Sequence, residues 1–192
     1  MATVETQTMT ADEFWEWADR PENEGRCWEL ERGKPIAIPA AGRLHGAVAC
    51  LITYFLGAYM FRRKTGYGCS NGTALLVEKN PDTIRGPDVM LFEEKCRLEE
   101  LSWKYATDVP RLVVEVLAPY DRPGSVIRRI TEYLRRGIPL VWVVDPEDRC
   151  VFVNRIGQLQ TLEETEELTG GDVLPDFRCR VGDFFRLSGE SA

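Results

Sequence analysis

Glu115 is an acidic residue in a run that is otherwise apolar, and its surroundings suggest chemistry. It interrupts the segment Leu112-Val113-Val114-Glu115-Val116-Leu117, which is typical of a central strand covered on both faces. Ionised carboxylates are seldom buried without a partner or a metal ion, because desolvation costs several kcal/mol. The sequence therefore predicts a counter-ion for Glu115, and the alternatives are a metal ion or an arginine of the next helix, Arg128 or Arg129.

A second carboxylate, that of Asp88, begins another predicted strand. The pair Gly86-Pro87 precedes it, and proline starts a strand rather than lying inside one. If the strands over 88–92 and 111–117 are neighbours, the two acidic residues lie within about 4.5 to 5.5 Å of each other at their Cβ atoms. Two carboxylates with water form a site that suits Mg²⁺ and leaves positions open for a substrate phosphate. The alternative is that Asp88 is a turn residue that follows Gly-Pro.

The order of the predicted elements indicates an α/β (α+β) fold, with helices interleaved with a mixed sheet. We expect one domain over residues 1–192, with an ordered part over 8–187 and short flexible termini. In chain order the other predicted elements are a short helix capped by Thr10, a hairpin over 28–38 that turns at Arg32-Gly33, a long buried helix over 44–64, a strand over 73–78, an amphipathic helix over 123–136, and strands over 140–144 and 150–153.

The composition argues against a generally basic nucleic-acid binder, a zinc protein, and a secreted or membrane-spanning protein. The 192 residues carry a formal net charge of −7, so any binding of nucleic acid must depend on a local site rather than on a general basic surface. The six cysteines contain no C-x-x-C pair, which favours free, buried thiols over a zinc site. The N-terminus lacks a signal-peptide core, and the apolar run over 47–61 is shorter than the ~20 residues of a membrane span. We therefore expect a cytoplasmic protein with no membrane partner.

Two further residues are candidates for contact with DNA or phosphate. His45, the single histidine, could contact a phosphate or help to order Glu29, although capping or packing is the alternative at the start of a helix. Arg128 belongs to an arginine-rich stretch over 122–136 that could meet a phosphate backbone. A solvated helix face is the alternative explanation for that stretch.

Several segments, taken in order, resemble the Uma family of restriction endonuclease-like proteins, which belongs to the PD-(D/E)xK nuclease superfamily. Together they cover roughly residues 8–187. The segments that carry the resemblance are Trp28–Lys34, His45, Gly86–Val89, Pro110–Leu117, Tyr133, Gly137–Pro146 and Leu174–Phe185. The resemblance implies a restriction endonuclease-like mixed β-sheet core flanked by helices, with an N-terminal hairpin. It also implies dependence on Mg²⁺ (or Mn²⁺), hydrolysis of phosphodiester bonds of DNA, and a homodimer.

Position by position, the resemblance assigns catalytic roles to four residues. Asp88 and Glu115 match the two acidic metal ligands of the superfamily, and Glu29 matches a glutamate of the hairpin that could bind the ion or its water. The superfamily lysine is replaced by Leu117, and the family's displaced lysine position is occupied by Arg129. Arginine stabilises phosphoryl charge but does not serve as a base at neutral pH. The alternative function is therefore a catalytically degenerate nuclease fold that acts as a binding or dimerisation module.

Overall fold

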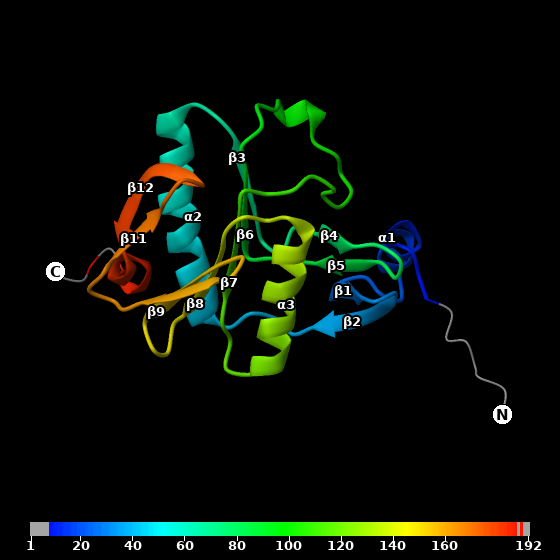
Figure 1. The fold of residues 1–192 in the computed structure, drawn as a ribbon. Helices are drawn as coiled ribbons and strands as arrows, with labels where there is room; N and C mark the ends of the chain where they lie inside the picture. The colour runs from blue at the N-terminus through cyan, green and yellow to red at the C-terminus, as the bar shows by residue number, and fades with distance from the viewer. Residues whose placement is uncertain (1–7, 188, 190–192) are drawn as a thin grey trace.

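The fold is mixed α+β, as the sequence predicts, and its strands form three sheets (Figure 1). The computed structural model describes residues 8–187 and 189. Within these residues the sheets have six, four and two strands. The termini that we expect to be flexible, residues 1–7 and most of 188–192, lie outside the described residues.

The six-stranded sheet contains the strand of Glu115 and the strand that Asp88 directly precedes. Its order is β10-β9-β8-β7-β6-β3. The pair β7–β8 is parallel and is connected through helix α3, whereas the other pairs are antiparallel. All five residues of β7 are buried, which confirms it as a central strand. The bounds are β3 Tyr67–Ser70, β6 Val89–Phe92, β7 Leu112–Val116, β8 Val141–Asp145, β9 Cys150–Arg155, β10 Gln158–Leu162 and α3 Pro123–Arg136.

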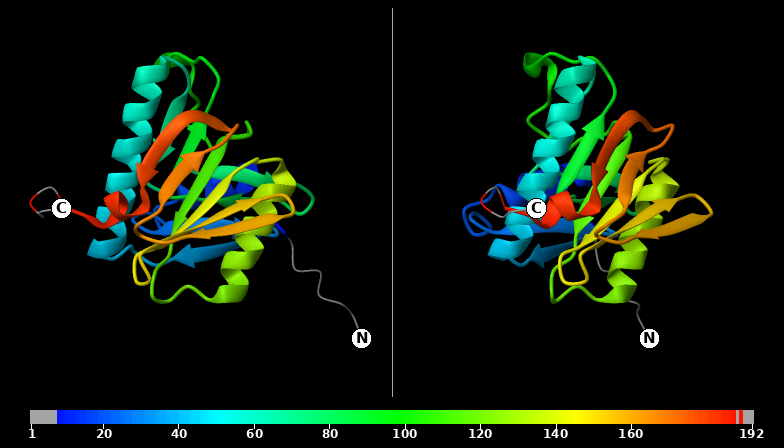
Figure 2. Two further views of the ribbon diagram at one scale, coloured as in Figure 1. Left: turned by 60° about the vertical axis from the view of Figure 1, so that its left-hand side comes forward. Right: turned by 90° about the vertical axis from the view of Figure 1, so that its left-hand side faces the viewer.

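Helices cover both faces of this sheet (Figure 2). Helix α2 (Arg43–Arg63) packs on one face through side chains spaced at helical intervals. On the other face α3 packs Tyr133 against a separate core, and α3 ends at Gly137, whose φ of 98° suits a left-handed C-terminal position. The buried side chains of α2 are Val48, Ile52, Leu56 and Tyr59.

The prediction of a buried helix over 44–64 holds for only one side of α2. Leu44, Tyr54 and Phe61 are exposed, because only one stripe of the helix contacts the sheet. By length and composition alone α2 is the one helix of the described residues that could cross a membrane.

The four-stranded sheet brings the N-terminal hairpin next to α3. Its order is β2-β1-β5-β4, and it packs on helix α1 (Ala11–Ala18), which begins with a capping box between Thr10 and Glu13. The hairpin turns at Arg32 and Gly33, whose φ values of 49° and 76° are those of a tight turn with two left-handed residues. The strands are β1 Cys27–Glu31, β2 Lys34–Ile38, β4 Leu75–Glu78 and β5 Thr83–Arg85.

The remaining elements lie near the C-terminus and in one long connection. Strands β11 and β12 form the two-stranded sheet, and η2 packs Phe184 near α2. Their bounds are β11 Glu167–Gly170, β12 Leu174–Arg180, η1 Leu98–Glu100 and η2 Val181–Phe185. All six cysteines are free, as predicted, but only Cys150 is buried as expected. Cys69 and Cys179 are partly buried, and Cys27, Cys50 and Cys96 are exposed.

Candidate active site

Glu115 lies in β7, and Asp88 directly precedes the neighbouring antiparallel strand β6. The β6–β7 pairing ends with Val89 opposite Val114, so Asp88 and Glu115 are the residues directly beyond this pair on the two segments, and the charge of Asp88 acts on Glu115. The backbone N–H of Val116 donates a hydrogen bond of 2.7 Å to Oδ2 of Asp88. This bond ties the Asp88 carboxylate to the strand that carries Glu115.

His45, in the first turn of α2, contacts Asp88. Its Nε2 lies 3.3 Å from Oδ2 of Asp88, and the hydrogen bond to that carboxylate raises the pKa of His45, although partial burial opposes the shift. The sequence suggested that His45 could order Glu29. The structure instead brings it to Asp88.

Glu115 is buried and receives two contacts from α3. The hydroxyl of Tyr133 donates a hydrogen bond to Oε1, and Nη1 of Arg129 lies 3.2 Å from Oε2. Residues four positions apart share one face of a helix, so both side chains reach the same carboxylate. Burial raises the pKa of Glu115 to about 7, with help from the charges of Asp88 and Glu29, whereas Arg129 and Tyr133 act in the opposite direction.

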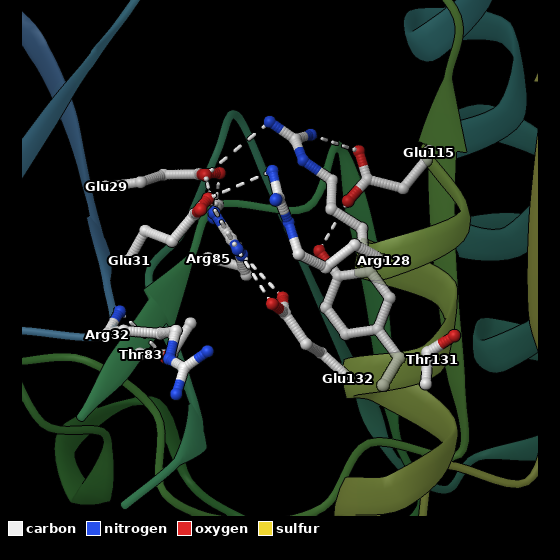
Figure 3. Close-up of polar contacts among 12 residues, drawn as sticks. Glu29, Glu31, Arg32, Thr83, Arg85, Glu115, Arg128, Thr131 and Glu132 are labelled. Atoms are coloured by element: carbon white, nitrogen blue, oxygen red, sulfur yellow. Dashed lines mark hydrogen bonds and ion pairs between the residues drawn. The ribbon is translucent and has the colours of Figure 1, made fainter. Parts of the chain in front are cut away.

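Arg129 also reaches Glu29 and thereby bridges the two larger sheets. Its Nη2 lies 3.5 Å from Oε2 of Glu29, whose Oε1 accepts a hydrogen bond of 3.0 Å from the backbone N–H of Gly86. Figure 3 shows the carboxylates of Glu29 and Glu115 pointing toward one another from opposite sides of this region. Of the two arginines proposed from the sequence as partners of Glu115, the structure pairs Arg129 with it.

Arg128 instead contacts Glu31. Its Nη2 lies 3.4 Å from a carboxylate oxygen of Glu31, and its side chain is 50% exposed. This half-exposed side chain lies beside the site, where the sequence predicts a contact with DNA.

A buried arginine, which the sequence analysis missed, fixes Glu29. Arg85, at the end of β5, has a side chain only 1% exposed and donates to Glu29 at 3.0 Å and to Glu31 at 3.1 Å. Its Nε and Nη2 form a two-pronged pair with Glu132 of α3, at 2.7 and 2.9 Å (Figure 3). One signal in the sequence pointed to this pair: Glu132 is adjacent to Tyr133 and three residues after Arg129, so it lies on the inward face of the helix.

The donor atoms at Asp88 and Glu115 suit Mg²⁺ or Mn²⁺. Mg²⁺ is commonly held by one or two carboxylates and keeps several waters. Among the described residues no hydrogen bond reaches Oδ1 of Asp88, so this oxygen is open to an ion. In the same part of the chain no group of three or more His, Cys, Asp or Glu side chains is arranged to hold a metal ion. The site would therefore depend on these two carboxylates, with water and substrate as further ligands.

The fold is the one that the resemblance implies. A mixed sheet with a helix on each face is the expected core of a restriction endonuclease-like protein. Residues 11–182 match the model of the Uma2 family, described as "Putative restriction endonuclease". The match covers most of the chain, and the protein belongs to this family, as the sequence predicts.

A solved structure shares the fold. It is titled as a "putative nuclease belonging to DUF820" from Anabaena variabilis, with a TM-score of 0.75 and 20% sequence identity, over 92% of this chain and 97% of that chain. At this identity the likeness concerns the fold. No curated protein matches the sequence.

Proposed function

We propose that this protein is a metal-dependent endonuclease that hydrolyses phosphodiester bonds of DNA. Family membership supports a nuclease and a nucleic acid as its substrate. The observation that carries the finer proposal is that the Asp88 carboxylate is bound to the backbone of Val116, next to Glu115, with Arg129 against Glu115.

Asp88 and Glu115 would hold Mg²⁺ or Mn²⁺ through their carboxylate oxygens. When bound, such an ion polarises a phosphoryl oxygen and acidifies a water. His45 and the backbone N–H of Val116 hold the Asp88 carboxylate in place. Tyr133 orients Glu115 through its hydroxyl.

The positive side chains around the site would bind the substrate. Arg129 would face the scissile phosphate and stabilise charge on its oxygens, but it would not act as a base. Next to these positive side chains, the carboxylate of Glu29, which Arg85 holds in place, would bind a water or the ion. His45 and the exposed Arg128 would contact DNA. Because such contacts displace counter-ions from DNA, we expect binding that weakens steeply as the salt concentration rises.

A second candidate function is a nuclease fold that binds without cleaving. The observation that favours it is the ion pair of Arg129 with Glu115, because the arginine already serves as a counter-ion there. The two positions at which the resemblance expects a lysine hold Leu117 and Arg129 instead. The homodimer, the cytoplasmic location and the lack of a membrane partner stay predictions.

Nicking of a supercoiled plasmid separates the two candidates. We expect the wild-type protein to nick DNA with Mn²⁺ or Mg²⁺ but not with EDTA. Asp88→Asn and Glu115→Gln should each slow nicking by at least about 100-fold, since each removes a metal ligand. Asp172→Asn is a matched control, because its carboxylate is 87% exposed and pairs with Arg155 at a distant turn. Nicking that survives both site variants would rule out the proposal.

A further inference from the structure

We infer that Arg129 is a resident counter-cation of the site, which a divalent ion must displace from Glu115 before the ion binds fully. The inference rests on the proposed function and adds a role for Arg129 before substrate arrives. The observation behind it is that a single guanidinium spans two acidic side chains, Glu115 and Glu29, which come from different sheets.

The contacts of Arg129 are long for charged hydrogen bonds. Its nitrogens lie 3.2 Å from Glu115 and 3.5 Å from Glu29, whereas charge-assisted bonds are typically ~2.7 to 2.9 Å. The four contacts of Arg85 span 2.7 to 3.1 Å. Of these two arginines, Arg129 is therefore the loosely held one.

Exposure separates the two arginines in the same way. The side chain of Arg129 is 20% exposed, while that of Arg85 is 1% exposed. Arg129 can turn toward solvent by changing its rotamer, but Arg85 would have to leave the protein interior with its partners. Of these two arginines, Arg129 is therefore the one that can act as a replaceable cation.

The carboxylates remain fixed when Arg129 moves away. Glu29 keeps its bonds to Arg85 and to the N–H of Gly86, and Glu115 keeps the hydroxyl of Tyr133. Two cations cannot share Oε2 of Glu115 without strong repulsion at this range. Displacement of Arg129 therefore opens a formed site, and the released guanidinium becomes available to a phosphate of the substrate.

This exchange predicts that metal and phosphate assist one another. A phosphate that pairs with Arg129 removes the competitor of the metal ion, and the metal ion frees Arg129 for the phosphate. By linkage, each ligand then raises the affinity of the other by the same factor.

Mn²⁺ titration calorimetry at pH 8 without DNA tests the inference. Arg129→Gln should bind Mn²⁺ at least tenfold more tightly than wild type, and Arg129→Lys should fall between them, because lysine keeps the charge but cannot bridge both carboxylates. Arg128→Gln removes the neighbouring charge and should change the Mn²⁺ affinity by less than threefold. Equal or weaker binding by Arg129→Gln, or equal tightening by Arg128→Gln, would overturn the inference.

A measurement on the wild-type chain avoids any folding defect of the variants. In side-chain NMR spectra the Nε–Hε signal of Arg129 should shift on addition of Mg²⁺, and that of Arg85 should stay in place. An Arg129 signal that stays unchanged while Mg²⁺ binds contradicts displacement.

The inference and the proposed function can fail separately. If Arg129→Gln binds Mn²⁺ more tightly but neither protein nicks DNA, the nuclease proposal fails and the role of Arg129 stands. If wild type nicks DNA and Arg129→Gln binds Mn²⁺ with the same affinity as wild type, only the role of Arg129 fails. If neither protein binds Mn²⁺, both fail.

Discussion

Replacement of Arg85 should strongly destabilise the protein, because this one side chain neutralises a buried group of carboxylates. It contacts Glu29, Glu31 and Glu132, of which Glu29 and Glu132 are buried. In Arg85→Met the side chain keeps its apolar volume but loses all of these contacts. Glu132 is then left without its two hydrogen bonds from Arg85.

The expected cost follows from the energetics of broken buried ion pairs. Removal of one partner of such a pair costs about 3 to 5 kcal/mol, because the other charge stays in a poorly solvated place. We expect the lower part of this range, since Glu29 keeps the N–H of Gly86 and the contact with Arg129. Domains are stable by roughly 5 to 15 kcal/mol in total, so the variant should lose a large part of its stability.

Urea unfolding followed by circular dichroism measures this loss as a difference in the free energy of unfolding. Arg128→Met is the matched control. Its side chain is 50% exposed and makes a surface pair with Glu31, so its loss should cost less than about 1 kcal/mol. Adding Glu132→Met to Arg85→Met should recover more than half of the loss, because an apolar pair replaces the orphaned carboxylate. A cost below about 1 kcal/mol for Arg85→Met, or no recovery in the double variant, would refute this reasoning.

Two further outcomes are expected. The pKa of Glu115 is about 7 in the folded protein and 4.5 as its ordinary value, so the folded state holds the proton more tightly. The stability that this group contributes is complete below pH 4.5 and is lost as the pH rises through 7, by up to roughly 3 kcal/mol. In urea unfolding measured from pH 4.5 to 8, the free energy of unfolding of Glu115→Gln should lack this fall with pH. An unchanged pH dependence in the variant would contradict the assignment. Gly66→Ala should lower the melting temperature more than Gly25→Ala. Both glycines have a φ near 75°. A Cβ at Gly66 would lie 2.3 Å from the carbonyl oxygen of Phe92, whereas a Cβ at Gly25 would have no atom within 4 Å. Equal melting temperatures of the two variants would contradict the close approach at Gly66.

The sequence predicted the elements whose local pattern is strong. The capped helix α1, the hairpin β1–β2, the helix α3 and the strands β7 and β8 all occur as expected. In each case a cap, a turn glycine or an apolar run specifies the element by itself.

Strands with weak local patterns could not be predicted in this way. Strand β5 has only three residues, all buried, and one of them is Arg85. Strand β10 has one buried residue of five, and it is paired because it follows β9 through a tight turn. The long helix α2 was found, but its exposed face was not, because an apolar sequence does not tell which side meets the sheet.

The candidate site was predicted in its central pair but not in its support. Glu115 stood out because it is acidic in an apolar strand, and Asp88 because it follows Gly86-Pro87 at the start of the next predicted strand. The pairing of Arg85 with Glu29 and Glu132 joins residues 56 and 47 positions apart. No local pattern encodes such a contact, so only the packing of the two sheets around α3 reveals it.

The central claim is that Asp88 and Glu115 together hold a divalent metal ion. A crystal of the protein soaked in Mn²⁺ tests it most directly through the anomalous difference density. We predict one strong peak within coordination distance of both carboxylates, with the guanidinium of Arg129 moved away from Glu115. A soak at saturating Mn²⁺ that leaves this position without a peak, with Arg129 still on Glu115, would contradict the account.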